Sequence, residues 1–183
     1  MIEEKSLNWS LMHLKKYYSS DFFPKVFEYS AIEYDWDNVK KHILSIDLNA
    51  YIPNSPIIGL AKKADGNYRI VHDLSPIDAL IYTSLVYEVS AKIEEYRIPE
   101  SEKIACSYRI LTDLNGSFFK TEDNGWLNFK EREKELLTSF KDGFILCCDI
   151  ADYYNQIYIH RIRNVLSEVI FHPSRVPRVK PLI

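Results

Sequence analysis

A short apolar run that ends in a carboxylate constrains the fold of this chain more than any other feature. The run covers residues 144–148, and Asp149 follows it directly, ahead of aromatic and amide side chains. A run of this kind is typical of a buried β-strand. A carboxylate at the end of a buried strand is costly unless a cation, a metal ion or hydrogen-bond donors lie near it. We therefore expect residues 144–148 to form a strand that delivers Asp149 to a functional site.

Composition indicates a folded chain with one good-sized domain or two small lobes. The chain has 183 residues, of which 46% are hydrophobic, enough for a real core and too many for a disordered protein. The 13 tyrosines and 9 phenylalanines, against 5 glycines, indicate a rigid and aromatic-rich molecule. The net charge of -3 provides no overall attraction to nucleic acid, so any binding of nucleic acid requires a local basic face.

The cysteines and the amino terminus favour a cytoplasmic protein. Cys106, Cys147 and Cys148 are an odd number of thiols, which we interpret as reduced core thiols. The histidines are scattered along the chain, so a zinc site is not expected. The amino terminus lacks the apolar core of a signal peptide, and no apolar stretch is long enough for a membrane span.

Two helices are expected within residues 1–50. Apolar residues recur at helical spacing from Ser6 to about Tyr18, which predicts an amphipathic helix. Asp35 fits the N-cap of a second helix that ends near Asp47. These helices say little about function.

A β-hairpin with a basic tip is predicted next. The strand-forming residues 57–61 and 68–71 flank the tight-turn dipeptide Asp65-Gly66. Two lysines and one arginine lie close to this turn. Taken in isolation, the simplest interpretation is a turn that carries solvated charges.

The chain between the hairpin and the apolar run predicts two helices and a strand. Ser75, Pro76 and Asp78 have the pattern of a capping box, which begins a helix that runs to about Tyr96. The further expected elements are a strand over 103–110, a loop at Asn115-Gly116 and a helix over 126–140.

Two interpretations of Asp149 follow from its local sequence. No arginine follows it until Arg161. A magnesium ion, bound by the carboxylate and by substrate phosphates, would balance the negative charge of Asp149. Alternatively, Asp149 is the N-cap of the segment that follows it, a role that aspartate often has. The local pattern alone does not separate the two interpretations.

The residues around Asp149 resemble the first catalytic motif of reverse transcriptases. The string Asp149-Ile-Ala-Asp-Tyr-Tyr-Asn-Gln-Ile157 is most similar to bacterial members of the retron, group II intron and phage-defence (abortive-infection) kind. Upstream, residues 58–71 resemble the fingers hairpin of these enzymes and lie in the same order. Residues 69–82 and Ser107-Tyr108-Arg109 are similar to defence-type members. The order and separation of these strings carry the resemblance, more than any one of them.

The resemblance implies roles for particular residues. Asp149 would be one of the paired aspartates that hold two magnesium ions, and the backbone of Ile150 would help to bind metal and triphosphate. Tyr154 would stack under the incoming sugar and select deoxynucleotides. Lys63 and Arg69 would reach the β- and γ-phosphates from the hairpin. The implied partners are an RNA template, a DNA primer and deoxynucleoside triphosphates, with no membrane.

The chain departs from the family downstream of Asp149. The second acidic motif, an aromatic-x-Asp-Asp, is missing from the sequence, as are the template-grip glycine motif and the thumb. One carboxylate cannot assemble a two-metal site, so we expect no polymerase activity from this chain alone. A partner chain would have to supply the rest of the palm. The proline-rich and basic tail, 171–183, is expected to be extended or disordered.

The expected fold is therefore α+β. It corresponds to a truncated right-hand polymerase that has the fingers and part of the palm. We expect a helical segment over 1–50, a fingers-like region over 51–143, the start of the palm over 144–170, and the tail. The expected function is that of a partial RNA-directed DNA polymerase from a bacterial phage-defence or retroelement system. One alternative is a non-catalytic module, derived from a polymerase lobe, that binds nucleic acid or protein. Another is an unrelated α+β regulatory domain in which Asp149 caps a helix.

Overall fold

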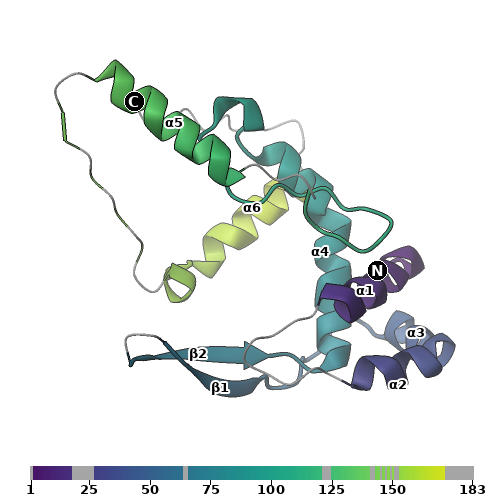
Figure 1. Cartoon of the computed structure of the whole chain (residues 1–183). Coiled ribbons are helices and arrows are strands. Elements are labelled where there is room, and N and C mark those ends of the chain that lie inside the picture. Colours follow the sequence, from purple (N-terminus) through teal and green to yellow (C-terminus); the bar gives the residue numbers. More distant parts are fainter. Residues whose placement is uncertain are drawn as a thin grey trace. The chain divides into compact units, whose positions relative to one another are not determined.

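The computed structural model describes residues 2–17, 27–63, 66–120, 125–140, 143–144, 146, 148, 150 and 153–171. Within these ranges the chain forms α-helices, short 3-10 helices and one antiparallel pair of strands (Figure 1). In chain order the elements are α1 (Glu4–Tyr17), α2 (Glu28–Tyr34), α3 (Trp36–Ser45), β1 (Ile57–Lys62), β2 (Tyr68–Asp73), α4 (Pro76–Tyr96), η1 (Glu100–Glu102), α5 (Gly125–Ser139), η2 (Tyr153–Gln156) and α6 (Ile159–Phe171).

By its contacts the chain divides into two compact units. The first comprises Met1–Glu88 with Leu111–Phe118, and the second comprises Val89–Ile110 with Phe119–Ile183. The first unit therefore contains α1, α2, α3, both strands and the first part of α4. The rest of α4, α5 and α6 belong to the second unit. The division predicted from the sequence, after residues 50, 143 and 170, stays a prediction.

The core of the first unit is built by its helices. Buried serines lie where α1 meets α4, with the Oγ atoms of Ser10 and Ser84 2.9 Å apart. Ser10 Oγ also donates to the Ser6 carbonyl at 2.7 Å. The small serine side chains at this contact between helices therefore have hydrogen-bonded hydroxyl groups. The buried apolar residues of this core are Ile2, Leu7, Leu11, Leu14, Tyr29, Ile43, Ala79, Leu80 and Ile81.

The helices predicted from periodicity and caps are confirmed. α1, α3, α4 and α5 begin and end within a few residues of the predicted bounds. The capping box is also confirmed, because the Ser75 hydroxyl accepts from the Asp78 backbone N–H at 3.3 Å. The sequence does not predict α2, which follows α1 after a segment outside the described residues.

The predicted strand over 103–110 is wrong. After α4 the chain forms the 3-10 turn η1, and within this stretch only Ile110 makes a β-bridge, to Phe119. The physical reason lies in the side chains of α4 and of the residue that follows it. Glu94 and Arg97 bind the backbone of residues 107–110 and so replace the pairing that a strand would need.

The predicted buried strand over 144–148 is wrong for the residues of it that the structure describes. Phe144 and Leu146 lie in no strand and are 106% and 85% exposed. A strand needs a neighbour to pair with its N–H and C=O groups, and no described strand lies beside this segment. Cys148 is an exposed free thiol rather than a core residue, and Cys106 is half-buried. Cys147 and Asp149 lie outside the described residues.

The loop over 111–118 packs closely on α1. Trp9 Nε1 donates to the Asp113 carbonyl at 2.7 Å, and His13 Nδ1 lies 2.6 Å from the Gly116 carbonyl. Because a carbonyl only accepts, Nδ1 carries the proton of this bond. Burial lowers the pKa of His13, and the hydrogen bond to Gly116 opposes that shift. At Gly116 the backbone φ is +85°, in the left-handed region.

Gly116→Ala is expected to lower the free energy of unfolding by about 2 kcal/mol. The added Cβ would sit on a left-handed backbone and would lie 3.1 Å from the backbone nitrogen of His13. Gly66 has the same φ of +85° with nothing within 4 Å of the added carbon, so Gly66→Ala should cost only about 1 kcal/mol. Urea unfolding of both variants measures the difference. Equal losses would show that the close approach to α1 contributes nothing.

Candidate functional site

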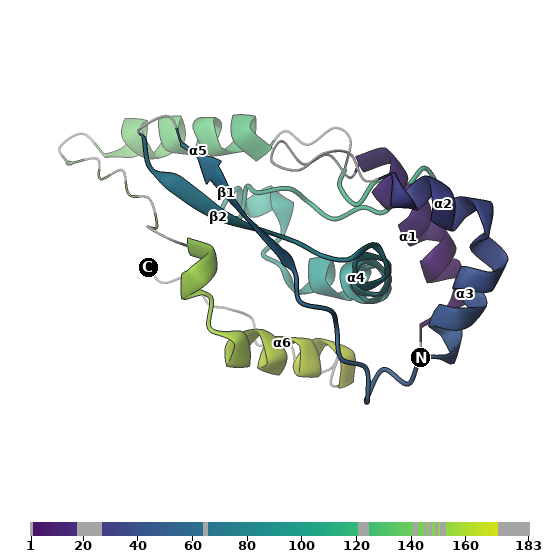
Figure 2. The same ribbon diagram turned by 90° about the horizontal axis from the view of Figure 1, so that it is seen from below.

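The basic hairpin is present with a defined register. β1 and β2 pair in antiparallel fashion, with Ala61 opposite Arg69 and Lys62 opposite Tyr68. The ladder continues into the turn, where the Lys63 backbone N–H donates to the Asn67 carbonyl at 2.7 Å. The strong twist expected of a two-stranded sheet is visible in Figure 2.

The register decides which basic side chains share a face. Residues opposite one another in an antiparallel pair lie on one face, and neighbours along a strand alternate. Arg69 therefore lies on the face of Ala61, and Lys63 falls on that same face when the alternation continues past β1. Lys62 lies on the opposite face with Tyr68. Both predicted phosphate-binding residues, Lys63 and Arg69, are exposed on one face of the tip.

Asp78 joins the segment that enters the hairpin to the helix that leaves it. Its Oδ1 accepts from the Tyr51 hydroxyl at 2.6 Å. Its Oδ2 accepts from Asn54, through the backbone N–H at 3.1 Å and the side-chain amide at 3.0 Å, and from Ser75 Oγ at 2.5 Å. Because Tyr51 and Asn54 precede β1 and Ser75 follows β2, one carboxylate fixes both ends of the hairpin.

The charge state of Asp78 follows from these donors. Burial alone would raise the pKa of Asp78, but the hydrogen bonds from Ser75, Tyr51 and Asn54 outweigh burial and hold the pKa below its ordinary value. Burial and the Asp78 carboxylate together raise the pKa of Tyr51 to about 12. The pair is therefore a neutral phenol that donates to an ionised carboxylate. The sequence indicates Asp78 only as a cap residue, and no local signal indicates Tyr51 or Asn54.

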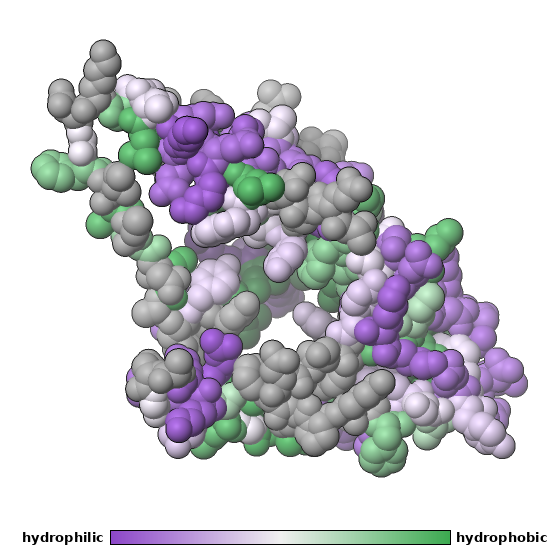
Figure 3. All heavy atoms as spheres, in the orientation of Figure 1, coloured by the Kyte–Doolittle hydropathy of each residue, from purple (hydrophilic) through white to green (hydrophobic). Residues whose placement is uncertain are grey.

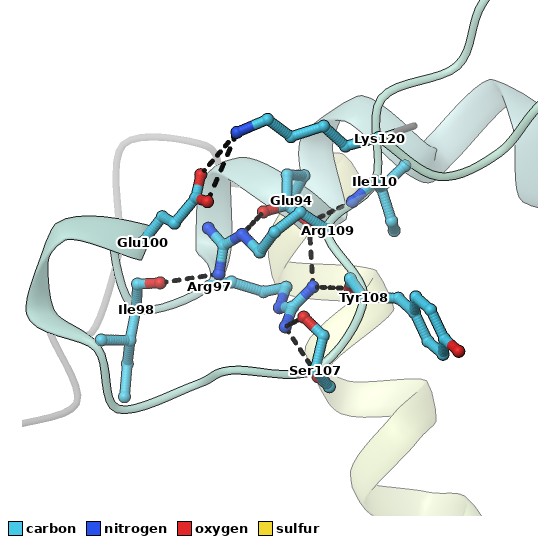
Figure 4. Close-up of polar contacts among 9 residues, drawn as sticks. All are labelled: Glu94, Arg97, Ile98, Glu100, Ser107, Tyr108, Arg109, Ile110 and Lys120. Atoms are coloured by element: carbon cyan, nitrogen blue, oxygen red, sulfur yellow. Dashed lines mark hydrogen bonds and ion pairs between the residues drawn. The ribbon is translucent and has the colours of Figure 1, made fainter. Parts of the chain in front are cut away.

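A second polar cluster, in the second unit, surrounds the Ser107-Tyr108-Arg109 string (Figure 4). Glu94 Oε1 lies 2.6 Å from Arg109 Nε, and its Oε2 accepts from the Ile110 N–H at 2.9 Å. Glu94 Oε2 also accepts from Arg97 Nη1 at 3.1 Å. We call Glu94, Arg97 and Arg109 the Glu94 cluster.

The Glu94 cluster holds backbone as well as charge. Arg97 Nη1 donates to the Tyr108 carbonyl at 2.5 Å, and Arg97 Nη2 donates to Ser107 Oγ at 2.9 Å. Arg109 Nη1 donates to the Ile98 carbonyl at 3.0 Å. The string that resembles defence-type polymerases therefore has a structural role here, because its arginine and carbonyls hold the chain after α4.

The predicted catalytic end of the site is described only in part. Asp149 lies outside the described residues. Ile150 is exposed and lies in no helix or strand, and Tyr154 lies in η2 with its side chain outside the described part. In the part of the chain that the structure describes, no group of His, Cys, Asp or Glu residues is placed to hold a metal ion. The magnesium site stays a prediction.

The comparisons with known proteins add no family. No family model, no curated protein and no solved structure matches this chain. None of the described helices combines the length and apolar character needed to cross a membrane.

Proposed function

We propose that this chain is the fingers and the start of the palm of an RNA-directed DNA polymerase of the reverse transcriptase kind. The observation that carries the proposal is the hairpin register, because Lys63 and Arg69 share one exposed face while Lys62 lies on the other. Two cations on one face suit a triphosphate, whose oxygens accept charge-assisted hydrogen bonds. The order of hairpin, capped helix and Asp149 along the chain also supports it.

In this proposal the hairpin binds and orients the triphosphate of a deoxynucleotide. The Asp149 carboxylate and the Ile150 carbonyl are hard oxygen donors of the kind that suits magnesium. Magnesium, when bound, would supply charge stabilisation for the attacking and leaving oxygens. Tyr154 would select the deoxyribose, and a second acidic motif, which residues 1–183 do not contain, would complete the metal site. RNA template and DNA primer would be the nucleic-acid partners.

The hairpin makes the proposal testable without the second acidic motif. We expect the full chain to bind dGTP in a magnesium-dependent manner, measured by isothermal titration calorimetry. Lys63→Ala and Arg69→Ala should each weaken binding roughly tenfold, because each removes a hydrogen bond to a charged group worth about 1.5 kcal/mol.

Lys62→Ala is the matched control, since it removes the same charge from the opposite face of the same hairpin. Its affinity for dGTP should stay within about twofold of the parent chain, as expected for an exposed charge that makes no direct contact. Equal losses in all three variants would mean that only net charge matters. Binding of an RNA–DNA primer-template that needs neither magnesium nor dGTP, and that Lys63→Ala leaves unchanged, would favour the non-catalytic nucleic-acid-binding module instead.

A further inference from the structure

The second unit contains an aromatic-walled cavity that the proposed function does not use. Its volume is about 540 Å³. Cys106 and Tyr108 line it from the segment after α4, and Trp126 and Phe129 line it from α5. Apolar side chains appear at several places on the face drawn in Figure 3. The residues named here line one hollow. Tyr108 and Trp126 are 70% and 68% exposed, so their rings are open to a ligand.

The rings around the cavity are ordered in pairs. Trp126 and Phe129 stack with ring centroids 5.7 Å apart and an interplanar angle of 24°. Tyr108 lies against Phe119 with centroids 5.3 Å apart. Aromatic rings favour offset or edge contacts with a further ring. Because these rings are already held by neighbours, binding a planar group costs little additional side-chain entropy.

Both walls of the cavity are held in position. Arg97 of the Glu94 cluster donates to the Tyr108 carbonyl and so fixes the first wall. Lys103 Nζ bridges that wall to α5, at 2.9 Å from Glu131 and 3.3 Å from Glu135. The hollow is therefore formed before any ligand arrives.

Charged side chains do not form the described lining of the cavity, and the lysine beside its rings is paired with a glutamate. None of the described residues that line it is an Asp, Glu, Lys, Arg or His. Lys130 Nζ lies 5.0 Å from the Trp126 ring centroid, but it also donates to Glu133 at 2.8 Å. A phosphate or carboxylate would meet no cation among the described lining residues, and Lys130, which also lies 5.8 Å from the Phe129 ring centroid, is already paired with Glu133. The walls therefore favour an uncharged occupant.

We propose that this cavity binds an uncharged, planar aromatic small molecule of two or three rings. The ligand packs against the rings of Tyr108, Trp126 and Phe129 and covers the Cys106 thiol. The cavity volume falls in the range of roughly 300–1,000 Å³ that is usual for small-molecule sites. None of the described lining residues belongs to the hairpin or has a predicted catalytic role, so the proposal does not depend on the polymerase assignment.

The probe for the test is N-phenylnaphthylamine, a neutral fluorescent molecule, and its sulfonated analogue anilinonaphthalene sulfonate is the charged comparison. We expect one neutral probe per chain, and about tenfold weaker binding of the sulfonate because its charge finds no lining cation. With the neutral probe at about ten times its Kd, alkylation of Cys106 by N-ethylmaleimide should slow about tenfold by mass action. The rate at Cys148, which is exposed and does not line the cavity, should not change.

Two variants complete the test. Trp126→Ala with Phe129→Ala should weaken binding of the neutral probe at least about tenfold, because two ring contacts are lost. Leu127→Ala, an exposed apolar residue of α5 that does not line the cavity, should leave binding unchanged. Several probes per chain, preferred binding of the sulfonate, or unprotected Cys106 would each overturn the proposal. So would self-association of the chain that the double variant abolishes, since the face would then be an interface between copies.

Discussion

Glu94→Ala is expected to lower the free energy of unfolding by about 3 kcal/mol. Removing one partner of a largely buried ion pair leaves the charge of the other partner uncompensated, which destabilises the folded state. The side chains of Glu94, Arg97 and Arg109 are only 18%, 20% and 11% exposed. The substitution removes the carboxylate that both guanidinium groups face, and it also removes the acceptor of the Ile110 N–H at 2.9 Å. The loss should therefore exceed that of an exposed salt bridge, which is about 0.5 kcal/mol.

Glu95→Ala provides the matched control, because Glu95 is an exposed carboxylate at the next position of the same helix. Urea unfolding measures the two free energies, and hydrogen exchange at the Ile110 amide reports on the cluster itself. We expect fast exchange at Ile110 in Glu94→Ala and unchanged exchange in Glu95→Ala. Two variants that lose the same stability would show that the Glu94 cluster does not hold the chain after α4.

Asp78→Ala should have an effect of similar size, with a loss of about 3 kcal/mol in the free energy of unfolding. Asp78 is 4% exposed, and its carboxylate accepts from Tyr51, from Asn54 twice and from Ser75. The variant leaves these donors without their acceptor and removes part of the capping box. Ser75→Ala removes only the cap hydroxyl and should cost about 1 kcal/mol. If Ser75→Ala costs as much as Asp78→Ala, the bonds to Tyr51 and Asn54 contribute no stability.

The same carboxylate predicts a dependence of stability on pH. The pKa of Asp78 is lower in the folded protein than its ordinary value of 3.8, so the unfolded chain binds the proton first as the pH falls. The stabilisation is complete above the unfolded pKa and is lost as the pH falls through the lower, folded pKa. Asp78→Asn, which cannot ionise, should flatten this part of the curve. Urea unfolding as a function of pH, from neutral to acid, measures it, and identical curves for the Asp78→Asn variant and the parent chain would exclude the linkage.

The elements that sequence reasoning predicted correctly depend on local chemistry. The helix of residues 76–96 begins at a Ser-Pro-x-Asp cap, and the hairpin turns near Gly66, where φ is +85°. Such signals act within a few residues of one another, so they can be recognised without knowing the rest of the fold. Alternation along each strand is also predictable, but whether Lys63 and Arg69 share a face depends on the register that the two strands adopt, and alternation does not predict that register.

The errors occur where a segment depends on distant partners. Residues 103–110 have strand-like composition, but Glu94 and Arg97 bind their backbone instead. The apolar segment at 144–148 has no described strand beside it, so its described residues are exposed. An apolar pattern identifies residues that would gain from burial, yet it does not specify which neighbour buries them.

By itself the sequence determined the positions of the main helices, the hairpin with its basic tip, and the cap at Ser75, because each depends on neighbouring residues. Only the tertiary structure decided that Asp78 links both ends of the hairpin and that the Glu94 cluster holds the chain after α4. It also decided that Tyr108, Trp126 and Phe129 surround one cavity. Each of these arrangements joins residues from segments that are separate in the sequence, and the energy of such contacts depends on packing that no local pattern encodes.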